Sequence, residues 1–368
     1  MRPENENGKK FNVGLYIALI LLVVAAVACG FFAYRFINEK NKLRSEWQAS
    51  YNERVTPLPT SKVTETPEVT KVAAADSAEA SEAVSEEVKD VSEEPTPEAT
   101  PEPTEEPEPL MPTDFLQSAN ACLIRGSDGA VLLNKEADAR VYPASMSKVM
   151  TAVVVLEHAG SLDDMVTVNV EDIDEAFVAE ASMAGFEAGE TVPVRDLLYG
   201  VMLPSGAEAC EALTTYVAGS RSAFVDMMNA KGAELGLEGT HFTNATGLHD
   251  ENHYTTCHDM AVLLGYAMKN PTFREIVSRA EYTCTPTEFH PDGLWFASTL
   301  YSNMGMTTFT NGAMLEGGKT GTTEEAGKCL VTAAAYYGEE YYLCTANAAL
   351  DSNGNFEDAV SVYSQLTR

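Results

Sequence analysis

Three short segments constrain the fold of this chain more than any other feature of its sequence. They are Ser145-Met146-Ser147-Lys148, Ser205-Gly206-Ala207 and Lys319-Thr320-Gly321. A serine and a lysine three residues apart on a helix share one face, with their Cβ atoms about 5–6 Å apart. A lysine in a partly dry pocket can take the proton of a serine hydroxyl and turn it into a nucleophile. The three segments therefore predict an acyl-transfer enzyme whose fold brings them together.

The residues around these segments support that interpretation. The sequence after Lys148 predicts an apolar helix that ends near Gly160. Ser145 would then lie in the first turn, where free backbone N–H groups can stabilise a developing oxyanion. Lys319-Thr320-Gly321 precedes the strand-forming run Leu330-Val331-Thr332. We therefore expect it to line a sheet edge that faces the serine.

Most of the chain after about residue 115 resembles the serine-type D-alanyl-D-alanine carboxypeptidases, which are the low-molecular-mass penicillin-binding proteins of the DD-peptidase/β-lactamase-like superfamily. Beyond the three segments, the resemblance rests on positions 119–133, 187–190, 196–206 and 244–256. It implies an α+β fold, in which an antiparallel sheet is flanked by helices and carries a mostly helical insert. The active site would lie between the sheet and the insert.

The resemblance also implies catalytic roles. Ser145 would attack the carbonyl of the penultimate D-alanine of a peptidoglycan stem peptide, and Lys148 would accept its proton. Ser205 would relay a proton to the departing D-alanine, and water would then hydrolyse the acyl-enzyme. β-Lactam antibiotics would acylate the same serine as inhibitors. Because the acylating base is disputed for relatives of this fold, Lys148 is a working assignment.

Substrate binding would fall to the third segment. Lys319 and Thr320 would hold the terminal carboxylate of the substrate, which suits a cation beside a hydroxyl donor. Gly321 and Thr322 complete this binding strand, and the backbone N–H groups of Ser145 and Thr322 would form the oxyanion hole.

The second segment departs from the pattern of the family, which usually reads Ser-x-Asn. Here the third residue is Ala207. An amide both donates and accepts hydrogen bonds, whereas a methyl group does neither. Losing one such contact costs about 1–3 kcal/mol, or roughly ten- to a hundredfold in rate. We expect a slowed enzyme, unless a small loop shift lets Glu208 replace the amide.

Two other functions stay open. A serine β-lactamase shares fold and motifs, but fast deacylation needs a carboxylate or carbamylated base, and the sequence offers no obvious one. A catalytically weakened penicillin-binding wall module is favoured by Ala207 alone. We expect no cofactor and no metal. The histidines and aspartates between His249 and Asp259 are better explained by a helix that Thr256 caps, with Asp259 at its third position.

The front of the chain predicts a membrane anchor. Residues 1–12 form a short tail, and residues 13–34 are a nearly unbroken apolar run of about 22 residues, long enough to cross a bilayer as a helix. Cleavage or lipid attachment near Cys29 is the alternative. We expect a single-pass protein of the cell membrane with an extracytoplasmic catalytic domain, because its expected substrate lies there.

Residues 35–112 contain a juxtamembrane segment and an acidic linker rich in Pro, Glu and Thr, which we expect to be disordered. The net charge of −31 argues against nucleic acid as a partner. Residues 113–368 would form one catalytic domain, with strands near 121–125, 130–133, 328–336 and 341–348 and a last helix at 356–366. The seven cysteines show no tight framework, so both disulfides and free buried thiols stay open.

Overall fold

The computed structural model describes residues 110–367. The predicted tail 1–12, the predicted membrane segment 13–34 and nearly all of the predicted linker 35–112 lie outside the described residues. Within residues 110–367, no helix has both the length and the apolar character needed to cross a membrane.

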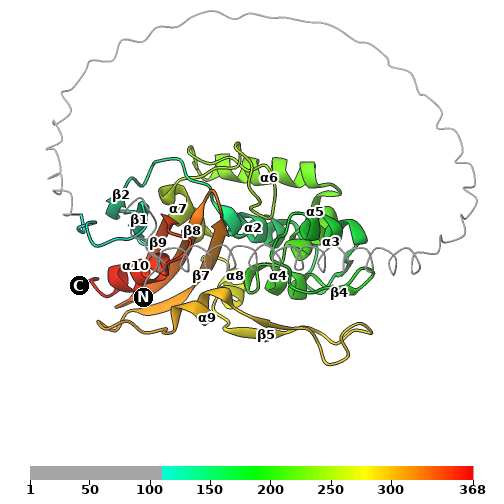
Figure 1. Ribbon diagram of the computed structural model, residues 1–368. Coiled ribbons are helices and arrows are strands. Elements are labelled where there is room, and N and C mark those ends of the chain that lie inside the picture. The colour runs from blue at the N-terminus through cyan, green and yellow to red at the C-terminus, as the bar shows by residue number, and fades with distance from the viewer. Residues whose placement is uncertain (1–109, 368) are drawn as a thin grey trace, which may run out of the picture. The chain divides into compact units, whose positions relative to one another are not determined.

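A five-stranded antiparallel sheet in the order β2-β1-β9-β8-β7 forms the centre of the described domain (Figure 1). Its strands are β1 (Asn120–Arg125), β2 (Val131–Lys135), β7 (Met314–Thr323), β8 (Gly327–Tyr336) and β9 (Glu339–Ala348). The four strands predicted from sequence are confirmed to within two residues. The structure also places β7 at the sheet edge, the position expected for Lys319-Thr320-Gly321, although the three glycines of this strand have low strand propensity. Both ends of the domain therefore build one sheet.

The two faces of the sheet are covered by different helices. Helix α10 (Gly354–Tyr363) packs on β8 and β9, and α9 (Thr299–Met304) packs on β7. On the other face α7 (Cys257–Ala267) packs on β1, β8 and β9, as Figure 1 shows. Alternate residues of a strand point to opposite faces. The apolar residues on the α10 face form one core cluster with that helix, including Leu123, Leu330, Leu343, Val362 and Tyr363.

The insert between β2 and β7 is mostly helical, as predicted. A short turn, η1 (Ala144–Ser147), leads into α2 (Lys148–His158). The remaining elements are α3 (Val170–Val178), α4 (Val194–Met202), α5 (Ala207–Ala218), α6 (Arg221–Glu234), α8 (Pro271–Val277), the paired strands β3 (Met165–Thr167) and β4 (Thr191–Pro193), and the paired strands β5 (Glu281–Thr283) and β6 (Trp295–Ala297). The architecture is α+β.

The amino end of α7 and the cysteines test two local predictions. The Thr256 side chain caps α7 by accepting a hydrogen bond from the backbone N–H of Asp259 at 3.0 Å. Across the described residues, no group of histidines, cysteines and carboxylates is arranged to hold a metal ion. The six cysteines in the described part of the chain are buried free thiols, which decides between the two alternatives left open for them.

Candidate active site

Ser145 and Lys148 lie where the short turn η1 passes into α2. Lys148 Nζ donates hydrogen bonds to Ser145 Oγ at 3.2 Å and to the carbonyl oxygen of Thr246 at 2.5 Å. Ser145 is half-buried, whereas Lys148 is only 2% exposed. The predicted pairing on one helical face is therefore present, although the serine lies in a 3-10 turn and not in the first turn of an α-helix. The arrangement aims a buried amine at a hydroxyl that solvent can reach.

Burial sets the protonation of this lysine. Removal from water disfavours the charged form and lowers the pKa of Lys148 below its ordinary value, while the thiol of Cys210 and the carboxyl groups of Glu208 and Glu211 oppose the shift. A lysine with a lowered pKa holds more of its neutral form near neutral pH. Only that form can accept the proton of Ser145.

Gly247 fixes the backbone just before the nucleophile. Its φ angle is +83°, and a Cβ atom placed there would lie 1.9 Å from the carbonyl oxygen of Ala144 and 2.8 Å from the backbone nitrogen of Ser145. Asn244 Oδ1 accepts a hydrogen bond from the Gly247 N–H at 2.8 Å and thereby holds the loop. Only a residue without a side chain fits this contact.

His253 supports the same turn from the interior. Its Nδ1 accepts from the backbone N–H of Thr243 at 3.0 Å, so the ring proton resides on Nε2, which lies 2.7 Å from Ser147 Oγ. Ser147 in turn donates to the carbonyl oxygen of Ala144 at 2.9 Å. Burial lowers the pKa of His253 to about 4, which keeps the ring neutral. The histidine therefore positions the turn that carries the serine.

The third segment lies on β7, opposite the serine. Gly321 approaches η1 so closely that a Cβ atom would lie 3.2 Å from the backbone nitrogen of Ser145. Lys319 is 1% exposed, and its Nζ donates to the carbonyl oxygen of Thr320 at 3.0 Å. Burial, and then the charge of Lys148, hold the pKa of Lys319 well below its ordinary value. The Thr320 hydroxyl is 2.8 Å from that of Thr299 on α9.

Ser205 occupies the turn between α4 and α5, with a left-handed φ of +70°. It is 5% exposed, and within the described structure its Oγ has no hydrogen-bond partner. Buried hydroxyl groups normally pair, and strained backbone tends to persist where function requires it. The unpaired Ser205 hydroxyl can therefore form a hydrogen bond with a substrate or a water molecule in the cleft.

Glu208, next to Ala207, uses one carboxylate oxygen to bind a separate loop, while its second oxygen, Oε2, is buried without a hydrogen-bond partner among the described residues. Its Oε1 accepts hydrogen bonds from the backbone N–H groups of Ala184 and Gly185, both at 2.7 Å, and of Phe186 at 3.3 Å. Burial raises the pKa of this carboxyl above its ordinary value despite these bonds. The Glu208 side chain thus holds the loop of residues 182–186. A second bond ties the same loop to α5, because the backbone N–H of Ala207 donates to the carbonyl oxygen of Ser182.

These elements enclose a cleft of about 280 Å³. Its lining residues come from the insert, from β7, from β8 and from the start of α10: Ser145, Ser182, Ser205, Thr299, Asn303, Thr320, Gly321, Thr322, Lys328, Asn353, Asn355 and Phe356. Five of the seven residues predicted from sequence line the cleft. The other two, Lys148 and Lys319, are buried and do not line it. The other lining residues carry no motif, so sequence reasoning missed them.

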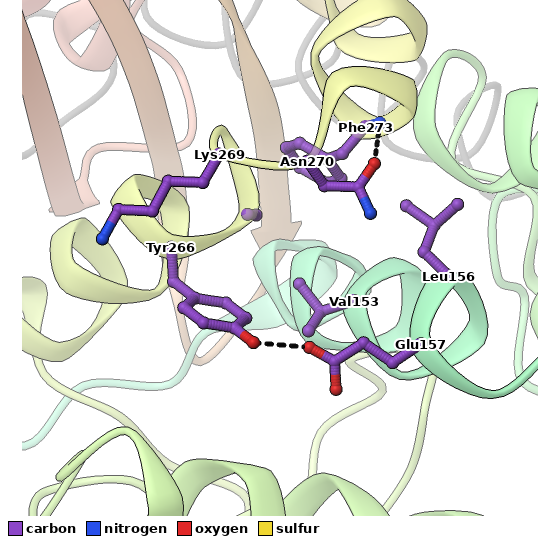
Figure 2. Close-up of a pocket in the computed structure, with 8 residues that line it drawn as sticks. Val153, Leu156, Glu157, Tyr266, Lys269, Asn270 and Phe273 are labelled. Atoms are coloured by element: carbon purple, nitrogen blue, oxygen red, sulfur yellow. Dashed lines mark hydrogen bonds between the residues drawn. The ribbon is translucent and has the colours of Figure 1, made fainter.

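A second cavity, of about 230 Å³, lies behind the far half of α2 and against α7 and α8 (Figure 2). Three of its polar lining residues, Glu157, Tyr266 and Asn270, already have hydrogen-bond partners. Tyr266 donates to Glu157 at 2.7 Å, Lys231 lies 2.9 Å from the same carboxylate, and Asn270 caps α8. None of the predicted site residues lines this cavity. The cleft at Ser145 is therefore the candidate active site.

A serine bonded to a buried lysine, facing the edge strand of an antiparallel sheet, is the arrangement of a serine peptidase that uses lysine as its base. The family described as D-alanyl-D-alanine carboxypeptidase, of the S11 peptidases, matches residues 106–349. The chain belongs to this family.

Characterised relatives agree with this assignment. The chain is 32% identical to the D-alanyl-D-alanine carboxypeptidase DacF of Bacillus subtilis, over 59% of this chain and 54% of that protein. It is 37% identical to the D-alanyl-D-alanine carboxypeptidase of Streptomyces sp. strain K15, over 57% of this chain and 74% of that protein. The matched region thus spans about half the length of the Bacillus enzyme. The solved Streptomyces K15 DD-transpeptidase gives a TM-score of 0.61 at 30% identity, covering 69% of this chain and 99% of that one.

Proposed function

We propose that this protein is a penicillin-sensitive serine D,D-carboxypeptidase that releases the terminal D-alanine from peptidoglycan stem peptides through an acyl-enzyme. The observation that carries the proposal is the 3.2 Å contact between Lys148 Nζ and Ser145 Oγ, with the lysine buried and its pKa lowered. The names of the relatives supply the substrate class.

The proposed acylation step uses Lys148 as the base and Ser205 as the proton relay. Neutral Lys148 takes the proton of Ser145, whose Oγ attacks the carbonyl carbon of the penultimate D-alanine. The backbone N–H groups of Ser145 and Thr322 hold the oxyanion that forms. Ser205 then donates its proton to the nitrogen of the departing D-alanine as the peptide bond breaks, and takes in exchange the proton that Lys148 accepted from Ser145. Its hydroxyl is suited to this step because no internal partner occupies it.

The terminal D-alanine binds along β7. The Thr320 hydroxyl, oriented by Thr299, donates to the terminal carboxylate, while Gly321 allows the substrate backbone to approach the strand. Lys319 is buried and acts indirectly, because its Nζ donates a hydrogen bond to the carbonyl oxygen of Thr320 and so holds the binding strand in place. Water admitted after D-alanine leaves then hydrolyses the ester at Ser145.

The cleft itself bears on the alternative of a β-lactamase. None of the twelve described residues that line it is an aspartate or glutamate. The nearby carboxyl of Glu208 accepts three backbone N–H groups and is fully buried. Fast deacylation needs a base that activates water at the ester, so we expect a slowly hydrolysed penicillin adduct.

Release of D-alanine from an N-acylated tripeptide ending in D-Ala-D-Ala tests the proposal. We expect release that is abolished by Ser145→Ala and preserved by Ser222→Ala, which removes an exposed serine far from the cleft lining. A protein that binds penicillin covalently yet releases no D-alanine would instead support the weakened wall module. Rapid turnover of penicillin would support the β-lactamase.

We also propose that residues 13–34 anchor the protein as a single-pass membrane helix, with the catalytic domain outside the cytoplasm. The support is the length and apolar character of this run and the location of the proposed substrate. Full-length protein should fractionate with membranes and be digested by protease added to intact cells lacking a wall. Recovery of a shortened soluble form, or of a lipid-modified Cys29, would support cleavage or lipid attachment instead.

A further inference from the structure

Lys328 is the charged side chain among the twelve residues that line the active-site cleft in the described part of the chain. Lys328 is the second residue of β8, and its side chain is half-buried. The two other lysines of the site, Lys148 and Lys319, are 2% and 1% exposed and lie beneath the wall. A substrate anion entering the cleft therefore meets Lys328 as its accessible cation.

The sheet places Lys328 beside the two threonines of the binding strand. Thr322 of β7 is directly opposite Lys328 of β8 in the antiparallel register, so their side chains share one face. Thr320 lies two residues from Thr322 and therefore points to that same face. Lys319 and Gly321 alternate to the other face. Two hydroxyl groups and one ammonium group thus gather on a single side of the strand edge.

The ammonium group of Lys328 has no ion-pair partner among the described residues. Its Nζ donates to the carbonyl oxygen of Ser352, in the loop between β9 and α10. Within residues 110–367, no carboxylate forms an ion pair with it. An ammonium group has three donors, so two are left for a ligand. Asn353 and Asn355, at the amino end of α10, line the same part of the cleft, and the partial positive charge of a helix amino end also favours an anion.

We propose that Lys328, together with the hydroxyl group of Thr320, binds the terminal carboxylate of the stem peptide and the carboxylate of β-lactams; the Thr322 hydroxyl already donates to the carbonyl oxygen of Gly321 at 2.8 Å. The proposal rests on the proposed function and deepens it. Lys319, buried near Lys148, stabilises the binding strand, whereas Lys328 supplies the charged contact to the carboxylate. Because an internal peptide bond presents no carboxylate at this position, Lys328 favours cleavage at a free carboxyl terminus over cleavage within a peptide.

Two substrates isolate this contact: an N-acylated tripeptide ending in D-Ala-D-Ala, and the same peptide as its carboxyl-terminal amide. The wild-type protein should prefer the free acid in kcat/KM. In Lys328→Met this preference should shrink by about ten- to a hundredfold, through loss of activity on the acid alone. Lys328→Arg, which keeps the charge, should restore most of it. Lys135→Met is the matched control, because Lys135 is also half-buried and donates to backbone carbonyl groups, at 2.9 and 2.7 Å, away from the cleft.

Acylation by benzylpenicillin and by its methyl ester, followed by intact mass, gives the same comparison without peptide hydrolysis. The proposal is overturned if Lys328→Met keeps the wild-type ratio of acid to amide and of penicillin to ester, or if both members of each pair fall equally. An equal fall would show that Lys328 only fastens the loop at Ser352. Failure of the proposed function is a different result, in which the wild-type protein is acylated by penicillin but releases no D-alanine.

Discussion

Replacing Gly247 by alanine separates the strain of a left-handed residue from the displacement of the nucleophile. Gly129, in the turn between β1 and β2, provides the matched control. Its φ angle is +73°, close to the +83° of Gly247, but a Cβ atom there would meet nothing within 4 Å. Both substitutions place alanine in left-handed backbone, at about 1–2 kcal/mol of stability each.

The two variants differ in what the new methyl group meets. At Gly247 the Cβ atom would lie 1.9 Å from the Ala144 carbonyl oxygen, whereas separations under 3.0 Å are essentially never seen. The backbone on one side must therefore move by about 1 Å, and the residue after Ala144 is the nucleophile. A displacement of about 1 Å costs roughly a hundredfold in rate.

Acylation by penicillin, measured from intact mass, and urea unfolding give the two readouts. Gly129→Ala should lose about 1–2 kcal/mol of stability with its acylation rate unchanged. Gly247→Ala should lose more stability and about a hundredfold in acylation rate while still folded. If folded Gly247→Ala acylates as fast as Gly129→Ala, the contact does not position Ser145 and the reasoning fails.

Other predictions follow from buried titratable and polar groups. Burial lowers the pKa of His253 in the folded protein to about 4, so the unfolded protein binds more protons between pH 6.5 and 4. The free energy of unfolding should therefore fall by up to about 3 kcal/mol as the pH drops through this window. In urea unfolding, His253→Gln should remove this pH dependence, and the control His258→Gln should keep it. Penicillin acylation should slow as falling pH protonates Lys148, and Lys148→Met should abolish it at every pH, whereas residual acylation with a wild-type pH profile would exclude Lys148 as base. Ser205→Ala removes a hydroxyl without an internal partner, so unfolding free energy should change by less than about 0.5 kcal/mol while D-alanine release falls; a stable variant with full activity would exclude the proton relay. Glu208→Ala should cost about 1–3 kcal/mol in unfolding experiments because it leaves backbone N–H groups unpaired, and an unchanged stability would contradict the loop-holding role.

The sequence predicts what depends on local spacing. Ser145 and Lys148 meet because they are three positions apart in one turn, and strands with short apolar or aromatic runs, such as β8 and β9, are visible from the sequence. The edge strand β7 is indicated only at Lys319-Thr320-Gly321, because its glycines have low strand propensity, and pairing with β8 holds the rest of it.

Contacts between distant segments could not be predicted. Gly247 fits against Ala144 only because the loop after α6 folds over η1, and Lys328 reaches the cleft only because β7 and β8 pair in one register. Glu208 illustrates the opposite limit. The sequence leaves Glu208 open as a replacement for the amide absent at Ala207, whereas the structure commits one oxygen of its carboxyl to backbone N–H groups of a separate loop.

The central claim is that Ser145 is an activated nucleophile although the second segment lacks its amide. The most direct test is to treat the full chain with benzylpenicillin, follow the intact mass over time, and map the adduct by peptide mass analysis. We predict one long-lived penicilloyl group on Ser145, absent in Ser145→Ala and in Lys148→Met. No adduct on the folded protein, or an adduct on another residue, would contradict it.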